Sequence, residues 1–417
     1  MFATALRCRA CHHTIPISLQ YHCSICNGIL EVIYDYESLG KSEVFHSALR
    51  GTSPYSGMWR YYPMLPLKDP TNIVSLGEGN TPLLPAPRLG RLLGVPQLFL
   101  KNEGANPTAS FKDRPSSTGI SIAKEFGVKQ VIIASSGNAG AATAAYAARA
   151  GLPCFVVVPE GTPFSKVAQA LSSGARVIFT KGSYSNSYQL AHAAAVSFGW
   201  ANLSSTFLNP FTVEGDKTIA YEIWEQLRHR VPDWIIIPIG AGPLLVGTLK
   251  GYEELKRFGL IKRLPAMVGV QSEAVHPIAD AFAANKTIVE EWHGNTKTVA
   301  SGIADPLIGY PQDGTLTLMA IRSSGGQCLV APDVATLEMG RKLAQTEGLF
   351  IEPTAATGIY GVLSLRKQGY IDSHDLVVVL LTAHGLKMPE AYEDVSFKPP
   401  VVNTLEELQV MLSCKHI

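Results

Sequence analysis

The chain of 417 residues has little net charge, few charged residues and no long apolar run. Its 35 basic and 34 acidic side chains give a net charge of +1 without any dense basic run, so electrostatics gives no reason to expect nucleic acid or a membrane surface as a partner. The longest weakly polar stretch, residues 134–159, is interrupted by an arginine, prolines and glycines and is not a membrane span. Met1–Arg9 has no apolar segment of signal-peptide length, so we expect a cytoplasmic protein.

Cysteine is scarce, and four of the seven cysteines form one pattern. Cys8 and Cys11 make one Cys-x-x-Cys pair, and Cys23 and Cys26 make a second after eleven intervening residues. Two such turns present four thiolates, which suits a structural Zn²⁺ ion. A redox pair and two disulfides are the alternatives, and a reducing compartment and the lack of a surrounding βαβ pattern disfavour both. We therefore predict a zinc-ribbon-like module over residues 1–35.

Apolar, β-branched segments alternate with helical segments from about residue 80 to residue 390. The expected strands are Leu98–Lys101, Val131–Ala134, Phe155–Val158, Val177–Thr180, Trp234–Ile237, Met267–Val270 and Leu376–Leu380. Near-continuous apolar strands with helical crossovers predict an α/β fold, whose twisted parallel or mixed sheets are buried on both faces. A hydrophobic content of 46% with only 17% charged residues fits a large, well-buried enzyme of more than one domain.

We expect two lobes with the active site in the cleft between them. The smaller lobe would span residues 115–210, and the larger would combine residues 76–114 with residues 211–395. Residues 36–75 are rich in Tyr, Pro and Ser and predict an irregular connecting arm. Residues 396–417 predict a C-terminal packing or subunit-contact helix, because Thr404 and Glu407 form a capping box ahead of a shared apolar face of Leu405, Leu408, Met411 and Leu412.

Lys112 lies in residues 106–114, in a sequence context that favours a reactive amine. It follows a loop broken by Pro107 and directly precedes a segment expected to be helical, residues 116–126. A lysine there is partly desolvated and close to the positive end of a helix dipole. Both effects favour the neutral amine, which is the form that attacks a carbonyl to make a Schiff base. Most lysines at such junctions are solvated surface charges, so the neighbouring motifs must decide.

Three polar or glycine-rich turns follow expected strands. Residues 135–140 (Ser-Ser-Gly-Asn-Ala-Gly) precede an alanine-rich helical run, residues 238–247 contain Gly-Ala-Gly-Pro-Leu before an expected helix at 245–255, and residues 381–387 contain Thr-Ala-His-Gly. In an open α/β sheet, ligands bind at the carboxyl ends of the strands, and helix N-termini there attract anions. The three turns therefore predict one ligand site shared with Lys112.

Together these four segments resemble the threonine synthase branch of the fold-type II pyridoxal-phosphate enzymes. The likeness extends to residues 77–83, 167–170 and 209–218, follows the family's order and covers roughly residues 75–390. It implies a two-lobed enzyme whose larger lobe binds pyridoxal phosphate. It also implies a small amino-acid substrate and a homodimer.

The resemblance implies a role for each turn. Lys112 matches the lysine that carries the cofactor as a Schiff base and, once freed, takes the Cα proton of the substrate. Asn138 matches the residue that hydrogen-bonds the cofactor's 3′ oxygen, and Thr382 the residue that meets the pyridine nitrogen. A hydroxyl there leaves the nitrogen neutral, which fits elimination and replacement better than transamination. The cofactor phosphate would bind at Gly240, Ala241, Gly242, Pro243 and Leu244, and the substrate carboxylate at Ser135, Ser136, Gly137, Asn138 and Ala139.

Simpler interpretations of these turns are open. Asn138 could belong to a plain helix N-cap and turn, and Thr382 could be an ordinary strand-end threonine. Gly240–Leu244 could begin a dinucleotide-binding motif, but Leu245 stands where the third glycine of G-x-G-x-x-G belongs. For His384 and Lys387, structural and catalytic roles are equally open.

The sequence departs from the family where threonine synthases bind the phosphate of their substrate, O-phosphohomoserine. Thr212 stands where the family usually has arginine, Ala139 where a threonine often follows Gly-Asn, and residues 205–207 where Asn and Ser side chains are usual. Loss of the arginine removes a charge-assisted contact of about 1.5–3 kcal/mol, for which Lys166 or Lys217 could compensate. The phosphate-binding turn and residues 300–303 also resemble the serine/threonine dehydratase relatives.

Two enzymatic functions follow, both of the carbon–oxygen lyase type. One is threonine synthase, which converts O-phosphohomoserine and water into L-threonine and phosphate. The other is a threonine-synthase-like serine/threonine ammonia-lyase or β-replacement enzyme. A third possibility is a non-catalytic cofactor-binding or zinc-ribbon interaction protein, against which the presence of Lys112 argues.

Overall fold

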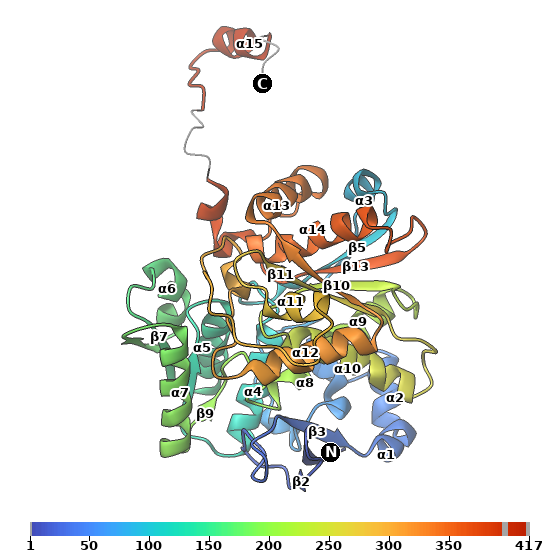
Figure 1. The fold of residues 1–417 in the computed structure, drawn as a ribbon, viewed down its shortest axis with the longest axis vertical. Helices are drawn as coiled ribbons and strands as arrows, with labels where there is room; N and C mark the ends of the chain where they lie inside the picture. The colour runs from blue at the N-terminus through green and yellow to red at the C-terminus, as the bar shows by residue number, and fades with distance from the viewer. Residues whose placement is uncertain (1, 394–398, 414–417) are drawn as a thin grey trace.

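The computed structural model describes residues 2–393 and 399–413, and its strands form three sheets (Figure 1). The largest sheet has the strand order β12-β11-β10-β13-β5-β4, and all neighbours are parallel except β4, which is antiparallel to β5. The second sheet, β8-β7-β6-β9, is parallel throughout. The expected α/β class with parallel and mixed sheets is therefore confirmed.

The strands of the largest sheet are β4 (Leu83–Pro85), β5 (Gln97–Asn102), β10 (Trp234–Pro238), β11 (Ala266–Ser272), β12 (Gln327–Ala331) and β13 (Leu376–Leu381). Those of the second sheet are β6 (Val131–Ala134), β7 (Cys154–Pro159), β8 (Arg176–Thr180) and β9 (Ala201–Asn202). Every strand expected from the sequence lies within one of these. The second sheet falls inside residues 115–210 and the largest sheet outside them, while the exact bounds of the two lobes stay a prediction.

The helices are α1 (Tyr36–Lys41), α2 (Glu43–Leu49), α3 (Pro87–Leu93), α4 (Asp113–Glu125), α5 (Asn138–Ala150), α6 (Phe164–Ser172), α7 (Tyr184–Phe198), α8 (Thr212–Asp216), α9 (Thr218–Gln226), α10 (Pro243–Arg257), α11 (Pro277–Ala283), α12 (Pro311–Ser323), α13 (Asp333–Glu347), α14 (Pro353–Lys367) and α15 (Leu405–Ser413). Short 3₁₀ turns are η1 (Gly57–Met64), η2 (Pro70–Asn72), η3 (Glu103–Ala105), η4 (Ser301–Ile303), η5 (Gly385–Lys387) and η6 (Pro389–Tyr392). Among the described residues, no helix combines the length and the apolar character needed to cross a membrane.

The N-terminal module is a small antiparallel sheet of order β2-β1-β3, made of β1 (Ala3–Cys8), β2 (Thr14–Ile15) and β3 (Leu30–Tyr34). The irregular course expected for residues 36–75 is wrong, because α1 and α2 lie there. Side chains cap both helices, since Asp35 accepts from the Ser38 amide and Ser42 accepts from the Phe45 amide. The segment is also anchored in the core by the buried residues Trp59 and Tyr61.

The predicted C-terminal helix is present as α15, while residues 396–398 and 414–417 of that segment lie outside the described residues. Its capping box is confirmed, because the Glu407 amide donates to Thr404 Oγ1 and the Thr404 amide donates to Glu407 Oε2, both at 3.2 Å. None of its residues is buried, so α15 does not pack on the remainder of the described chain.

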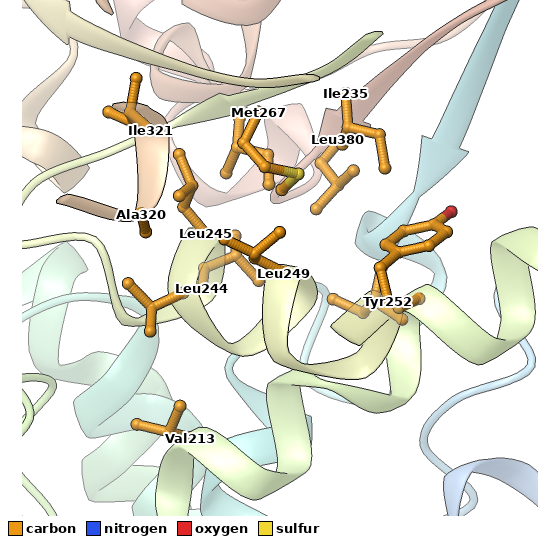
Figure 2. Packing of buried hydrophobic residues seen from close by; sticks show 14 of the residues in the cluster. Val213, Ile235, Leu244, Leu245, Leu249, Tyr252, Met267, Ala320, Ile321 and Leu380 are labelled. Carbon is orange, nitrogen blue, oxygen red and sulfur yellow. The ribbon is translucent and has the colours of Figure 1, made fainter. Parts of the chain in front are cut away.

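Helix α10 packs one apolar face on the largest sheet. Leu245 and Leu249 belong to the same buried cluster as Ile235, Met267 and Leu380 from three neighbouring strands (Figure 2). Burial of side chains of this size contributes about 1.5–3 kcal/mol each relative to exposure. The packing fixes the N-terminus of α10 at the carboxyl end of β10.

A group of four buried charges connects β5, α4 and α9. Arg114 donates to both oxygens of Glu103 and to both oxygens of Glu222, each at 2.8 Å. Lys101 Nζ donates to Glu222 Oε2 at 2.7 Å, and all four side chains are fully buried. Burial alone would raise the pKa of Glu222, but the charges of Arg114 and Lys101 hold that pKa well below its ordinary value.

We predict that Arg114→Met lowers the free energy of unfolding by about 3–5 kcal/mol, because it leaves Glu103 and Glu222 buried with one cation between them. Denaturant unfolding of the purified protein measures the change. The control is Lys41→Met in the exposed pair with Glu37, for which we expect about 0.5 kcal/mol or less. Equal effects of the two substitutions would contradict a structural role for the buried group.

Candidate active site

Every residue proposed for cofactor or substrate binding lines a single cavity of about 440 Å³. Lys112 enters it from the start of α4, Asn138 from the start of α5, and Thr382 from the end of β13. The turn Gly240–Leu244 closes another side, between β10 and α10. The cavity also receives Ser135, Ser136, Gly137 and Ala139. The structure thus brings together side chains that are far apart in the sequence.

Lys112 is the N-cap residue of α4, so the expected position at a helix N-terminus is confirmed. Its side chain is partly buried, and Nζ lies 4.3 Å from the centroid of the Phe111 ring. Burial lowers the pKa of the Lys112 amine, while the negative charges of Asp216, Asp305 and Glu352 oppose that shift. A larger fraction of the Lys112 amine is therefore in the neutral form that Schiff-base chemistry requires than on an exposed lysine.

The turn at Asn138 is not a side-chain cap. The N-cap residue of α5 is Gly137, and no side chain caps that helix. Asn138 Nδ2 instead donates to the two carboxylate oxygens of Glu352, at 3.1 and 3.3 Å. Gly140 is required for this tight course, since a Cβ there would lie 2.2 Å from the Ser135 carbonyl oxygen. The simple N-cap interpretation of Asn138 is wrong, and its side chain is directed to the cavity wall.

The turn Gly240–Leu244 has the geometry of an anion site. Gly242 has φ +99°, and a Cβ there would lie 2.2 Å from Thr317 Oγ1, so only glycine fits. Helix α10 begins at the next residue, Pro243. Within the described residues, the amides of Gly242 and Leu244 donate to no protein acceptor. Free amides at a helix N-terminus are suited to a phosphate dianion.

Thr382 has the properties expected of a group that meets a ligand. The residue is 2% exposed, and its Oγ1 has no hydrogen-bond partner although it lines the cavity. A buried hydroxyl without a partner is costly unless a ligand satisfies it. His384, two residues later, accepts from the Leu386 amide at 3.1 Å and is not among the residues that line the cavity. Lys387 lines the cavity.

Sequence reasoning missed two acidic residues in the cavity wall, Asp305 and Glu352. Asp305 Oδ1 accepts from the Tyr310 hydroxyl at 2.7 Å and from the Leu307 amide at 3.0 Å. Burial raises the pKa of both carboxyl groups. Each precedes a proline, and Glu352 is the N-cap residue of α14. The sequence feature that could have indicated both residues is an acidic side chain directly before a proline.

The two lysines considered for a second phosphate lie in different surroundings. Lys217 is buried and pairs with Glu214 at 2.7 Å and with Glu254 at 3.0 Å, so the expectation that it could compensate for the missing arginine is wrong. Lys166 lines the cavity, and its Nζ donates to Ser301 Oγ at 3.3 Å. Thr212 is buried, with Oγ1 donating to the Asn209 carbonyl at 2.8 Å.

The four N-terminal cysteines form one cluster away from the cavity. The sulfur atoms lie within 4.8 Å of one another, with Cys8 and Cys26 at 3.4 Å and Cys11 and Cys23 at 3.6 Å. All four are free thiols, so the disulfide alternative is wrong for this structure. Four converging sulfur atoms can hold a metal ion.

Comparison with known proteins agrees with the site. A family model described as pyridoxal-phosphate dependent enzyme matches residues 74–383. The threonine synthase of Methanocaldococcus jannaschii is 41% identical over 395 residues, which cover 94% of this chain and 95% of the relative. The threonine synthase of Methanosarcina acetivorans is 38% identical, with 92% of each chain covered.

The same fold occurs in the processed form of threonine deaminase isoform 2 from Solanum lycopersicum. That structure aligns with a TM-score of 0.65 at 20% identity and covers 79% of this chain and 90% of its own. The chain therefore belongs to the pyridoxal-phosphate-dependent enzymes and, among them, to the threonine synthase-like carbon–oxygen lyases. The resemblance inferred from the motifs is confirmed.

Proposed function

We propose that the protein is a threonine synthase, which converts O-phosphohomoserine and water into L-threonine and phosphate, with Lys112 as the catalytic lysine. The observation that carries the proposal is the position of Lys112. Its amine lies in one cavity with an anion-binding turn and a buried hydroxyl that lacks a partner. The identity of 41% to a threonine synthase over 94% of the chain supports the same activity.

The cavity fits pyridoxal phosphate. Lys112 would hold the cofactor through its ε-amine, and the free amides of Gly242 and Leu244 would bind the phosphate. Thr382 Oγ1, which has no protein partner, would meet the ring nitrogen, and Asn138 would bind the 3′ oxygen. Bound there, the cofactor supplies an electron sink that stabilises negative charge on the substrate carbons.

The protein's own groups would bind the substrate and move its protons. The amides after Ser135 and Ser136, at the start of α5, would hold the substrate carboxylate. Lys112 would take and return protons at the substrate carbon next to the amine. Lys166, which lines the same cavity, would bind the phosphate of the substrate in place of the missing arginine.

A serine/threonine ammonia-lyase is the second candidate, and Thr212 is the observation that favours it. The Thr212 hydroxyl is already engaged with the Asn209 carbonyl and carries no charge, so it cannot replace a bidentate arginine. An unphosphorylated hydroxy-amino acid needs no such group.

We predict that Lys112→Ala abolishes the cofactor adduct that borohydride traps, because the other two lysines of the cavity are engaged, Lys166 with Ser301 Oγ and Lys387 with the Thr108 carbonyl. Mass spectrometry of the reduced protein locates the adduct. Lys387→Ala removes a second lysine from the same cavity and is expected to retain the adduct at Lys112. Normal trapping in Lys112→Ala would refute the assignment.

We predict that the enzyme releases phosphate and forms threonine from O-phosphohomoserine, and that Lys166→Met raises KM for this substrate about tenfold or more, through loss of a charge-assisted contact. Lys41→Met, at an exposed position, is the control and should leave KM unchanged. Assays with L-threonine and L-serine detect ketoacid and ammonia. Turnover of these two amino acids alone would favour the lyase.

We further propose that the cysteine cluster holds a structural Zn²⁺ ion, because four thiolates at this separation leave no open coordination position. Protein purified without chelator should contain about one zinc per chain by elemental analysis. Cys11→Ser should lose the metal, whereas Cys154→Ser, at a buried cysteine outside the cluster, should keep it. Metal-free wild-type protein would contradict the proposal. The homodimer and the cytoplasmic location stay predictions.

A further inference from the structure

A second, small cavity lies next to Lys112. Its volume is about 20 Å³, and it shares Lys112, Ala139, Ser205 and Pro243 with the main cavity. A space of this size holds about one water molecule, provided that polar groups surround it. The polar residues in its lining are Lys112, Asp216, Ser116, Ser204, Ser205, Thr206 and Thr212.

Asp216 is the last residue of α8 and is 2% exposed. Its Oδ1 has no hydrogen-bond partner, which is unusual for a buried carboxyl group. On the side of α10 the residue is packed tightly, since a Cβ at Gly247 would lie 2.7 Å from the Asp216 Cβ. Because Asp216 lines the small cavity, a group in that cavity can satisfy the hydrogen-bonding capacity of Oδ1.

The charges around Asp216 come from three groups. Burial raises the pKa of Asp216 to about 7, the positive charges of Lys112 and Arg114 oppose this, and Glu103 adds to it. Arg114 already binds Glu103 and Glu222. Among the described residues that line the small cavity, those from α5, α10 and residues 203–206 carry no titratable side chain. Lys112 is therefore the cation with which Asp216 can exchange a proton.

We propose that Asp216 is a positioning residue that acts through Lys112. The Asp216 carboxyl group accepts a proton from the Lys112 amine, and later returns it, through a single water molecule in the small cavity. The inference rests on the proposed function, because it requires Lys112 to act as the base of the reaction. It adds a residue that the motifs did not indicate and a defined route for the proton.

The transfer balances with one water molecule. When Lys112 has taken a proton from the substrate carbon, its ammonium group donates one proton to the water oxygen. The water gives one of its own protons to Asp216 Oδ1 and is otherwise unchanged. The reverse transfer returns the proton to Lys112 and then to the substrate. The ionised carboxylate is needed to receive the proton, so activity should rise with pH as Asp216 ionises.

Asp216→Asn tests the proposal with two measurements. In the wild type, we expect kcat to rise with pH through an apparent pKa of about 7, the value to which burial raises the Asp216 carboxyl. In Asp216→Asn, that acidic limb should disappear and kcat should fall about tenfold or more, with KM little changed, because Asp216 does not line the main cavity.

The second measurement is the rate at which pyridoxal phosphate combines with the apoenzyme, followed by absorbance between pH 6 and pH 9. Without the nearby carboxylate, the pKa of the Lys112 amine falls and more of it is neutral. We expect combination at pH 8 to be about tenfold faster in Asp216→Asn than in the wild type, corresponding to a shift of one unit.

Asp313→Asn is the matched control. Asp313 is also buried, burial likewise raises its pKa to about 7, and it accepts from the Phe207 amide, but it lines neither cavity. It should retain both the acidic limb and the wild-type combination rate. Loss of the acidic limb in Asp313→Asn as well would assign the effect to general destabilisation and overturn the proposal.

The outcomes separate the two assignments. If borohydride trapping locates the cofactor at Lys112 but Asp216→Asn keeps the wild-type pH dependence in both measurements, the role of Asp216 is overturned and the proposed function stands. If Asp216→Asn does not fold, the pH dependence of the wild-type combination rate serves as the test. A wild-type combination rate without an inflection between pH 6 and pH 8 would overturn the proposal.

Discussion

The active site depends on the buried ion pairs of Arg114. This residue lies in the first turn of α4, two positions after Lys112, and it binds Glu103 after β5 and Glu222 on α9. Charges buried in this way are held in one geometry, because a missing partner leaves an uncompensated charge. The start of α4 is therefore fixed relative to the largest sheet. The direction in which the Lys112 amine enters the cavity follows from that constraint.

Much of the fold could be predicted because its strands are apolar and β-branched on both faces. The expected segment Val131–Ala134 coincides with β6, and Leu376–Leu380 accounts for most of β13. The strand β12 was missed because Gln327 and Cys328 weaken its apolar pattern, and β9 because it has only two residues. The helices of residues 36–75 were missed because they are short, and side-chain caps and packing on the core stabilise them more than intrinsic propensity does.

The candidate site was predictable where a turn directly follows a strand. Thr382 and the turn Gly240–Leu244 could be placed together because β13 and β10 are parallel neighbours with their carboxyl ends at one edge of the largest sheet. Asn138 follows β6 of the second sheet, and Lys112 lies at the start of α4, so for these two residues the motif resemblance carried the inference. The acids Asp305 and Glu352 could not, because no spacing connects them to Lys112 along the chain. Lys217 was considered only as a possible replacement for the missing arginine, and this possibility is wrong. The motif that contains it lies close to the cavity, but its side chain is directed away, to Glu214 and Glu254.

The N-terminal module is joined to the enzyme through charge as well as apolar packing. The Tyr34 hydroxyl, at the end of β3, donates to Glu214 Oε2 at 2.7 Å, and Lys250 Nζ donates to the Val32 carbonyl at 3.0 Å. Both partners belong to the ion-pair group that contains Lys217, and Glu214 lies on the same short helix as Asp216. A truncated protein beginning after residue 35 would remove the Tyr34 partner of Glu214 and the Val32 partner of Lys250 and expose both charges to solvent. Residues 2–35 thus supply hydrogen-bond partners to buried charges of the larger domain, and their removal would affect the enzyme's interior.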